Sequence, residues 1–128
     1  MPTALSAGIV TDQPDELLSF YGDALGLEVE SSSEFPQGSI HRLRRGDARL
    51  KLYTPVDAVA RTGRPDPWYR AAGFAYAALL LDDVEAAAAS VERAGGEILV
   101  APTSHRPGAV YALIADPQGN VWELLQED

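Results

Sequence analysis

Apolar positions along the chain follow two periods in turn, and their order predicts the same series of elements twice. An apolar strand at residues 5–10 precedes a stretch with helical spacing, whose apolar positions are Leu17, Phe20, Tyr21, Ala24 and Leu25. A strand at residues 74–81 likewise precedes an Ala-rich helix that runs to Ala94. Alternating apolar positions between turn residues predict three more strands after each helix. These strands are residues 27–31, 39–45 and 48–53 in the first half, and 97–100, 109–115 and 120–125 in the second.

The two predicted helices begin and end with similar residue types at one common offset. The capping candidates are Asp12 or Gln13 in the first half and Asp82 or Asp83 in the second. Gly26 and Gly96 follow the last helical turns, where glycine accepts the left-handed conformation that ends a helix. Asp12 to Asp82 and Gly26 to Gly96 are both 70 residues apart (82 − 12 and 96 − 26). The chain therefore contains an internal repeat of one β-α-β-β-β unit.

The repeat predicts how the single domain of residues 1–128 is organised. We expect one module at about residues 1–54, a linker at about 55–72, and a second module at about 73–128. The linker contains Pro55, Gly63, Pro65 and Pro67, which disfavour regular structure. Neither module alone can cover both faces of its strands. The sequence therefore predicts an α+β fold, in which two paired βαβββ modules form one curved mixed sheet with both helices on its convex face.

Strand alternation assigns side chains to the two faces of this sheet. The side chains expected to face the helices are Leu50, Leu52, Trp122 and Leu124. Those expected on the concave face are Arg49, Lys51, Tyr53, Glu123 and Leu125. A concave surface that mixes apolar and polar groups on a rigid sheet is suited to binding a small ligand.

Composition and charge narrow the function classes. The net charge of −9 argues against a nucleic-acid partner, because phosphates require a basic surface. The absence of cysteine excludes disulfides, thiolate catalysis and Cys-ligated zinc. No apolar run approaches the roughly 18 to 20 residues that span a bilayer, so no membrane partner is expected. The amino terminus has no basic segment typical of a signal peptide, which favours a cytoplasmic protein.

Three motifs in order relate the chain to a known superfamily. They are Phe20-Tyr21-x-x-x-Leu25-Gly26-Leu27, Leu81-Asp82-Asp83-Val84 with Ala94-Gly95-Gly96, and Asp116-Pro117-x-Gly119-Asn120-x-x-Glu123-Leu124. This arrangement resembles the vicinal oxygen chelate superfamily, which includes glyoxalase I, extradiol dioxygenases, fosfomycin-modifying enzymes and bleomycin-resistance proteins. The resemblance implies a homodimer. It also implies that metal ligands, where they exist, would occupy the positions of Ser6, Lys51, Tyr76 and Glu123.

The residues at those four positions do not form a set of metal ligands. Glu123 is a good ligand, whereas a serine hydroxyl and a phenol are poor ligands and an ammonium repels a cation. A catalytic Zn²⁺, Fe²⁺ or Mn²⁺ needs about three protein ligands. We therefore expect no metal site and no cofactor, and we expect Lys51 to form an ion pair with Glu123. A site built from His41, His105 and Glu123 is an alternative, although neither histidine is at a superfamily ligand position.

Aromatic and basic residues supply the other binding candidates. The aromatic candidates are Tyr53, Phe74 and Tyr76 on the concave side, with Trp68 and Tyr69 near its mouth. Aromatic rings stack on flat ligands and attract cations. Ser6, Leu125 and His41 complete the expected ligand-binding set. A local basic cluster, made of Arg42, Arg44, Arg45 and Arg49, forms either a salt-bridged surface or a group that orients an anion on the ligand.

Two functions are consistent with these residues. The first is a metal-free protein of the bleomycin-resistance type, which sequesters an aromatic or cationic small molecule in the cavity of the curved sheet. The second is an enzyme of the same fold. It would be a lyase, isomerase or cyclase with Glu123 as general base and Tyr76 or Lys51 stabilising an anionic intermediate. A metal-dependent enzyme of the glyoxalase or dioxygenase type is less favoured, because three ligand positions do not match.

Overall fold

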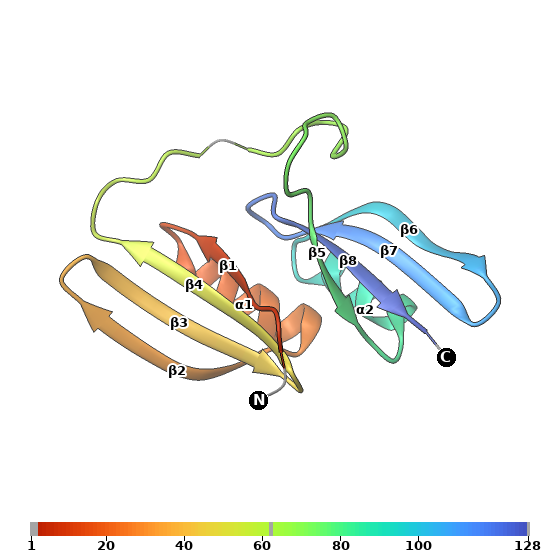
Figure 1. Ribbon diagram of the computed structural model, residues 1–128, viewed down its shortest axis with the longest axis horizontal. Coiled ribbons are helices and arrows are strands. Elements are labelled where there is room, and N and C mark those ends of the chain that lie inside the picture. Colours follow the sequence, from red (N-terminus) through yellow and green to blue (C-terminus); the bar gives the residue numbers. More distant parts are fainter. Residues whose placement is uncertain (1–2, 62, 128) are drawn as a thin grey trace.

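Each half of the chain folds into a four-stranded sheet with one helix across it (Figure 1). The computed structural model describes residues 3–61 and 63–127, except the side chain of His105. The first module contains β1 (Ala7–Val10), α1 (Pro14–Leu25), β2 (Glu28–Phe35), β3 (Gly38–Arg45) and β4 (Ala48–Pro55). The second contains β5 (Ala77–Leu80), α2 (Val84–Arg93), β6 (Glu97–Arg106), β7 (Ala109–Ala115) and β8 (Val121–Gln126). The predicted α+β fold of two βαβββ modules is confirmed.

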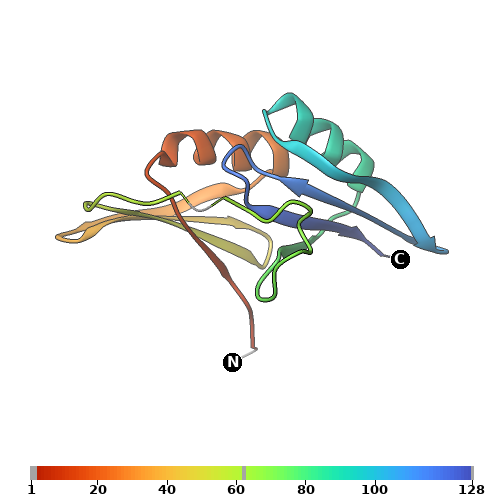
Figure 2. The ribbon, with the colours of Figure 1, turned by 90° about the horizontal axis from the view of Figure 1, so that it is seen from above.

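The two sheets have the same strand order. It is β1-β4-β3-β2 in the first module and β5-β8-β7-β6 in the second. In each sheet the first pair, β1 with β4 or β5 with β8, is parallel, and the other pairs are antiparallel. Strands β1 and β5 are the sheet edges that face each other (Figure 1), and no ladder joins the two sheets in the described chain. The modules pack together mainly through α1 and α2. Both helices lie on one side of the sheets (Figure 2), as expected.

The helix ends explain where each helix begins and stops. Asp83 caps α2, since its Oδ1 accepts a hydrogen bond from the Ala86 amide at 3.0 Å. At the start of α1, the side chain of Gln13 forms no capping hydrogen bond. The backbone N–H of Gln13 instead donates to Thr11 Oγ1 at 3.0 Å. Gly26 ends α1 in the left-handed conformation, with φ of 68°. Asp12 does not cap α1 but forms an ion pair with Arg61 of the linker at 2.6 Å.

Three predicted element boundaries are wrong. The segment expected as a loop, residues 101–108, mostly continues β6 as far as Arg106. The pairing of β6 with β7 shifts register at three places, so its apolar positions do not alternate as a regular strand would. Strand β2 extends to Phe35, and β5 begins only at Ala77, which leaves Phe74 and Tyr76 outside it.

One apolar cluster joins the two modules. The buried residues Leu50, Leu52, Trp122 and Leu124 are all part of it, which confirms the faces predicted for β4 and β8. The helices contribute from both modules, through residues such as Leu17, Phe20 and Leu25 of α1 and Val84 and Val91 of α2. The sheet face opposite the helices is therefore free to form a ligand site.

Neither α1 nor α2 combines the length and apolar character that a membrane-crossing helix needs.

The homodimer implied by the superfamily resemblance stays a prediction.

Candidate functional site

Strand register places Lys51 on the face of the first sheet that points away from the helices. In the parallel pairing of β1 with β4, Leu50 lies beside Ala7 and Lys51 beside Gly8. Leu50 is buried under α1, and side chains of neighbouring residues in a strand point to opposite faces. Lys51, Tyr53, Gly8 and Val10 therefore share the open face, as predicted for Lys51 and Tyr53.

The second sheet repeats this arrangement with different side chains. Glu123 of β8 lies beside Ala78 of β5 and opposite Leu113 of β7. The positions Gly8 and Ala78 correspond under the 70-residue repeat (78 − 8). Glu123 is half-buried, and no hydrogen bond or ion pair joins its carboxylate to another residue within the described ranges.

A cavity of about 800 Å³ lies between the two modules and the linker. Its walls come from β1 with the residues before it, from linker residues, from the start of β5, and from the turn into β8. The lining residues that carry large or polar side chains are Leu5, Ser6, Arg61, Arg64, Trp68, Phe74, Tyr76, Gln118, Asn120 and Trp122. No aspartate or glutamate is present in its lining as far as residues 3–61 and 63–127 show.

Aromatic side chains from the segment between β4 and β5 form one wall of this larger cavity. The ring centroids of Trp68 and Tyr76 are 5.7 Å apart, at an edge-to-face angle of 72°. Phe74 lines the same cavity and is fully exposed, whereas Tyr69 contacts Trp68 from outside the lining at 5.4 Å. The flat ring of a ligand could pack against this wall in the edge-to-face or offset arrangement that aromatic pairs favour.

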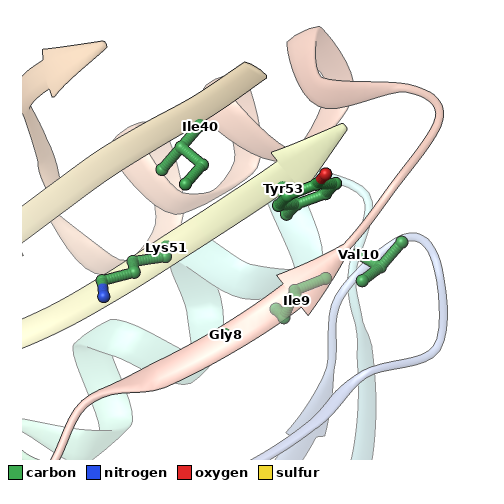
Figure 3. A pocket seen from close by; sticks show the side chains of 6 residues that line it. All are labelled: Gly8, Ile9, Val10, Ile40, Lys51 and Tyr53. Carbon is green, nitrogen blue, oxygen red and sulfur yellow. The ribbon is translucent and has the colours of Figure 1, made fainter. Parts of the chain in front are cut away.

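A second, smaller cavity of about 460 Å³ lies on the open face of the first sheet (Figure 3). It is lined by Gly8, Ile9, Val10, Ile40, Lys51 and Tyr53. Figure 3 shows the Lys51 and Tyr53 side chains extending from β4 and Ile40 from β3, with Gly8 on the neighbouring strand. The lining of this cavity shares Gly8, Ile9 and Val10 with that of the larger one.

The four positions at which the superfamily would place metal ligands do not line one cavity together. Ser6 and Tyr76 line the larger cavity, Lys51 lines the smaller one, and Glu123 lines neither. The expected ion pair between Lys51 and Glu123 is not formed. The reason is topological, because β1 and β5 both lie between the strands that carry these two residues.

Two other predicted ligand residues lie away from the cavities. His41 pairs with Leu52 across β3 and β4, so its side chain is on the helix side of the sheet. Its Nδ1 is 2.8 Å from Ser32 Oγ on β2, and the prediction that His41 belongs to the concave site is therefore wrong. Leu125 pairs with Leu80 at the open face of the second sheet, but it lines neither cavity.

The donor set at the four superfamily positions does not fit a metal ion, whereas the alternative site with His105 depends on a side chain outside the described part of the chain. Within the residues described, no group of three or more histidine, aspartate or glutamate side chains lies close enough to hold one. A serine hydroxyl, a lysine ammonium and a phenol accompany Glu123 at the four superfamily positions, and these groups do not make up the three good ligands that a catalytic ion needs.

Several cavity residues were missed from the sequence. Arg61 and Arg64 of the linker line the larger cavity, although each is neutralised, by Asp12 at 2.6 Å and by Glu97 at 2.7 Å. Gly8 could have been found, since an isolated glycine in an apolar strand indicates open space or a close approach. A Cβ built at Gly8 would meet no atom within 4 Å.

The fold and the sequence agree with one protein family. Residues 3–124 match the Glyoxalase/Bleomycin resistance protein/Dioxygenase superfamily, and the chain belongs to it. A glyoxalase family protein from Bacillus cereus has a similar structure, with a TM-score of 0.78 and 18% identity over 95% of this chain and 91% of that one. Glyoxalase I from Zea mays aligns with a TM-score of 0.74 and 21% identity, over 94% of this chain and 43% of the maize chain.

Sequence relatives carry enzyme names. The chain is 32% identical over 121 residues to a Mycobacterium bovis protein named "Putative glyoxylase CFP32", covering 92% of this chain. It spans only 41% of that protein's length. A Synechocystis protein named "Probable lactoylglutathione lyase" is 26% identical over 113 residues, which cover 88% of this chain and 86% of that protein.

Proposed function

We propose that the protein binds an aromatic small molecule, without a metal ion, in the larger cavity between its two modules. The observation that carries this proposal is the aromatic wall of Trp68, Phe74 and Tyr76 on a cavity of about 800 Å³. That volume lies in the range of ligand pockets, and the lining combines apolar side chains with a few polar groups.

The charges around the cavities favour an aromatic ligand over a cationic one. The charged residues among the described lining of the two cavities are Lys51, Arg61 and Arg64, and all three are basic. A cationic ligand would enter without a carboxylate to balance its charge, although the aromatic faces could still attract it. An aromatic ligand without positive charge can bind through contacts with the rings of the aromatic wall and with the apolar residues of β1 alone.

The enzyme names of the relatives support a second candidate, a lyase that uses Glu123 as general base. A general base must come within hydrogen-bond reach of the proton that it removes. Glu123 lies outside both cavity linings, which makes sequestration the better-supported function.

The experiment that tests binding uses phenylnaphthylamine, a neutral aromatic dye whose fluorescence rises in apolar sites. We expect saturable binding of one dye per chain, weakened at least tenfold in Trp68→Ala and in Gly8→Val. Gly8 lines both cavities, so valine at this position would add a side chain to the wall of each, and β-branched residues suit a strand. Gly22→Ala is the matched control, because Gly22 lies in α1 and outside both linings. Equal dye affinity in all variants would overturn the proposal.

Turnover separates binding from catalysis. The name of the Synechocystis relative contains lactoylglutathione, and the favoured direction of that lyase reaction is the formation of this thioester from glutathione and methylglyoxal. The protein is incubated with glutathione and methylglyoxal, and the thioester is followed by mass spectrometry. We expect no thioester above the level of a protein-free control. Its formation at many molecules per chain, lost in Glu123→Gln, would replace the binding function with the lyase.

A further inference from the structure

We infer that Lys51 is an anion-binding residue, which holds a carboxylate or similar acidic group of the aromatic ligand in the smaller cavity. This inference rests on the proposed function and adds the chemical class of the ligand, an aromatic acid.

The first argument is the charge of the open face of the first sheet. The register of β3 with β4 sets Arg42 directly opposite Lys51, and Arg44 directly opposite Arg49. Like charges directly opposite each other across strands destabilise a sheet. Four cations therefore gather on one sheet face of a protein whose net charge is −9, although folding alone would favour a different arrangement.

The second argument is that the side chains of β2 that pair with the neighbouring arginines form no contact of this kind with Lys51. Glu30 of β2 lies between Arg44 and Arg49, at 3.6 Å and 3.8 Å. Arg42 donates to two hydroxyls of β2, those of Ser31 at 3.4 Å and Ser33 at 3.0 Å. Of these four cations, Lys51 is the one with no hydrogen bond or ion pair to another residue in the described part of the chain.

The third argument is the space beside Lys51. Its neighbour on β1 is Gly8, where an added Cβ would meet no atom within 4 Å. Tyr53 and Ile40 border the same cavity, and Lys51 itself is exposed, so an anionic group can reach its ammonium next to two largely apolar side chains (Figure 3). A hydrogen bond between an ammonium and an anionic group is stronger than one between neutral groups.

The fourth argument is the connection with the aromatic wall. The smaller cavity and the larger one share the lining residues Gly8, Ile9 and Val10, so both border β1, and the inferred ligand would span them. Its ring would lie against Trp68 and Tyr76 and its acidic group beside Lys51. Among the described lining residues of the two cavities, none is acidic and would repel that group.

A matched pair of dyes tests this inference. Anilinonaphthalene sulfonate has the ring system of phenylnaphthylamine with one added anionic group. We expect the wild-type protein to bind the sulfonate dye more tightly than the neutral dye. Lys51→Gln should weaken the sulfonate dye by about threefold to tenfold and leave the neutral dye unchanged. Arg93→Gln removes the same charge from α2, on the helix side, and should change neither affinity. Added salt should reduce the wild-type preference.

Lys51 is the only lysine in the chain, which allows a direct readout. Reductive methylation with isotopically labelled formaldehyde keeps the ammonium charge and gives one lysine signal in carbon NMR, besides that of the terminal amine. We expect the sulfonate dye to shift this lysine signal and the neutral dye to shift it much less. If both dyes bind equally, Lys51→Gln has no effect and the signal does not move, the anion site is refuted while the proposed function stands. If neither dye binds, the proposed function fails and this site fails with it.

Discussion

The hydroxyl of Tyr21 donates a hydrogen bond of 2.5 Å to Oδ2 of Asp116, and this contact joins the two modules. Tyr21 lies in α1, whereas Asp116 begins the turn that leads into β8. The same hydroxyl accepts a bond of 2.7 Å from Trp122 Nε1, and all three residues are buried. Asp116 also accepts from Gln118 and Asn120, so the turn and the helix position each other. This network sets the relative position of the sheet edges that border the larger cavity.

Replacing Tyr21 by phenylalanine should destabilise the protein by about 1–3 kcal/mol. The substitution keeps the ring but removes two buried hydrogen bonds, and it leaves the Trp122 Nε1–H without its acceptor. The free energy of unfolding in urea, followed by circular dichroism, measures the change. Tyr69→Phe is the control, because Tyr69 is exposed in the linker and should change stability by less than about 0.5 kcal/mol. Equal stabilities of the two variants would contradict the assigned role.

Stability should fall at alkaline pH more steeply in the wild type than in Tyr21→Phe. Burial raises the pKa of the Tyr21 phenol well above its ordinary value, and the negative charge of Asp116 raises it further. The folded state therefore favours the neutral phenol, while the unfolded chain ionises it near pH of about 10. The stabilisation from this group is complete below that pH and is lost as pH rises toward the folded-state pKa. Urea midpoints of the two proteins, measured from about pH 8 to 11, should therefore converge as the wild type loses its advantage, and parallel curves would refute this origin.

Gly96 should tolerate no side chain, since it lies where the modules pack. A Cβ there would come within 2.7 Å of Phe20 Cε1 in the other module, 2.7 Å of Val91 Cγ1 and 2.8 Å of the Ala115 carbonyl oxygen. We expect Gly96→Ala to destabilise by about 1–3 kcal/mol. Gly22→Ala is the matched opposite: its nearest atom, the Leu27 carbonyl oxygen, is 3.7 Å away, so the helix should gain about 0.5–1 kcal/mol. Thermal unfolding of both variants checks the sign of each effect.

The fold was predictable because each level of the sequence pointed the same way. Helical spacing before Gly26, the capping Asp83 and the alternation around Leu50 and Trp122 all match the structure. Strand β6 was mispredicted because its register shifts break the alternation on which a strand prediction depends. Only pairing with β7 extends it to Arg106, and pairing is a tertiary property.

The site was less predictable than the fold. Alternation placed Lys51 and Tyr53 on the correct face, but it could not show which strands lie between Lys51 and Glu123. The sequence does not show which residue of the neighbouring strand lies opposite His41. Its pairing with Leu52 puts its side chain on the helix side of the sheet. The contribution of Arg61 and Arg64 depends on how the linker folds over the sheet edge, which local patterns do not encode.

Divalent ions should bind only weakly to the protein. The superfamily resemblance implies a metal ligand at the position of Lys51, where this chain has a positive charge, and Glu123 lines neither cavity. Among the described side chains, three good donors do not converge on one point. Isothermal titration with Zn²⁺, Mn²⁺ and Ni²⁺ should show no stoichiometric tight site, and none of these ions should raise the thermal midpoint. Glu123→Ala should behave like the wild type in both measurements. A tight one-to-one site that disappears in Glu123→Ala would instead show that Glu123 is a ligand. It would also remove the basis for a metal-free function.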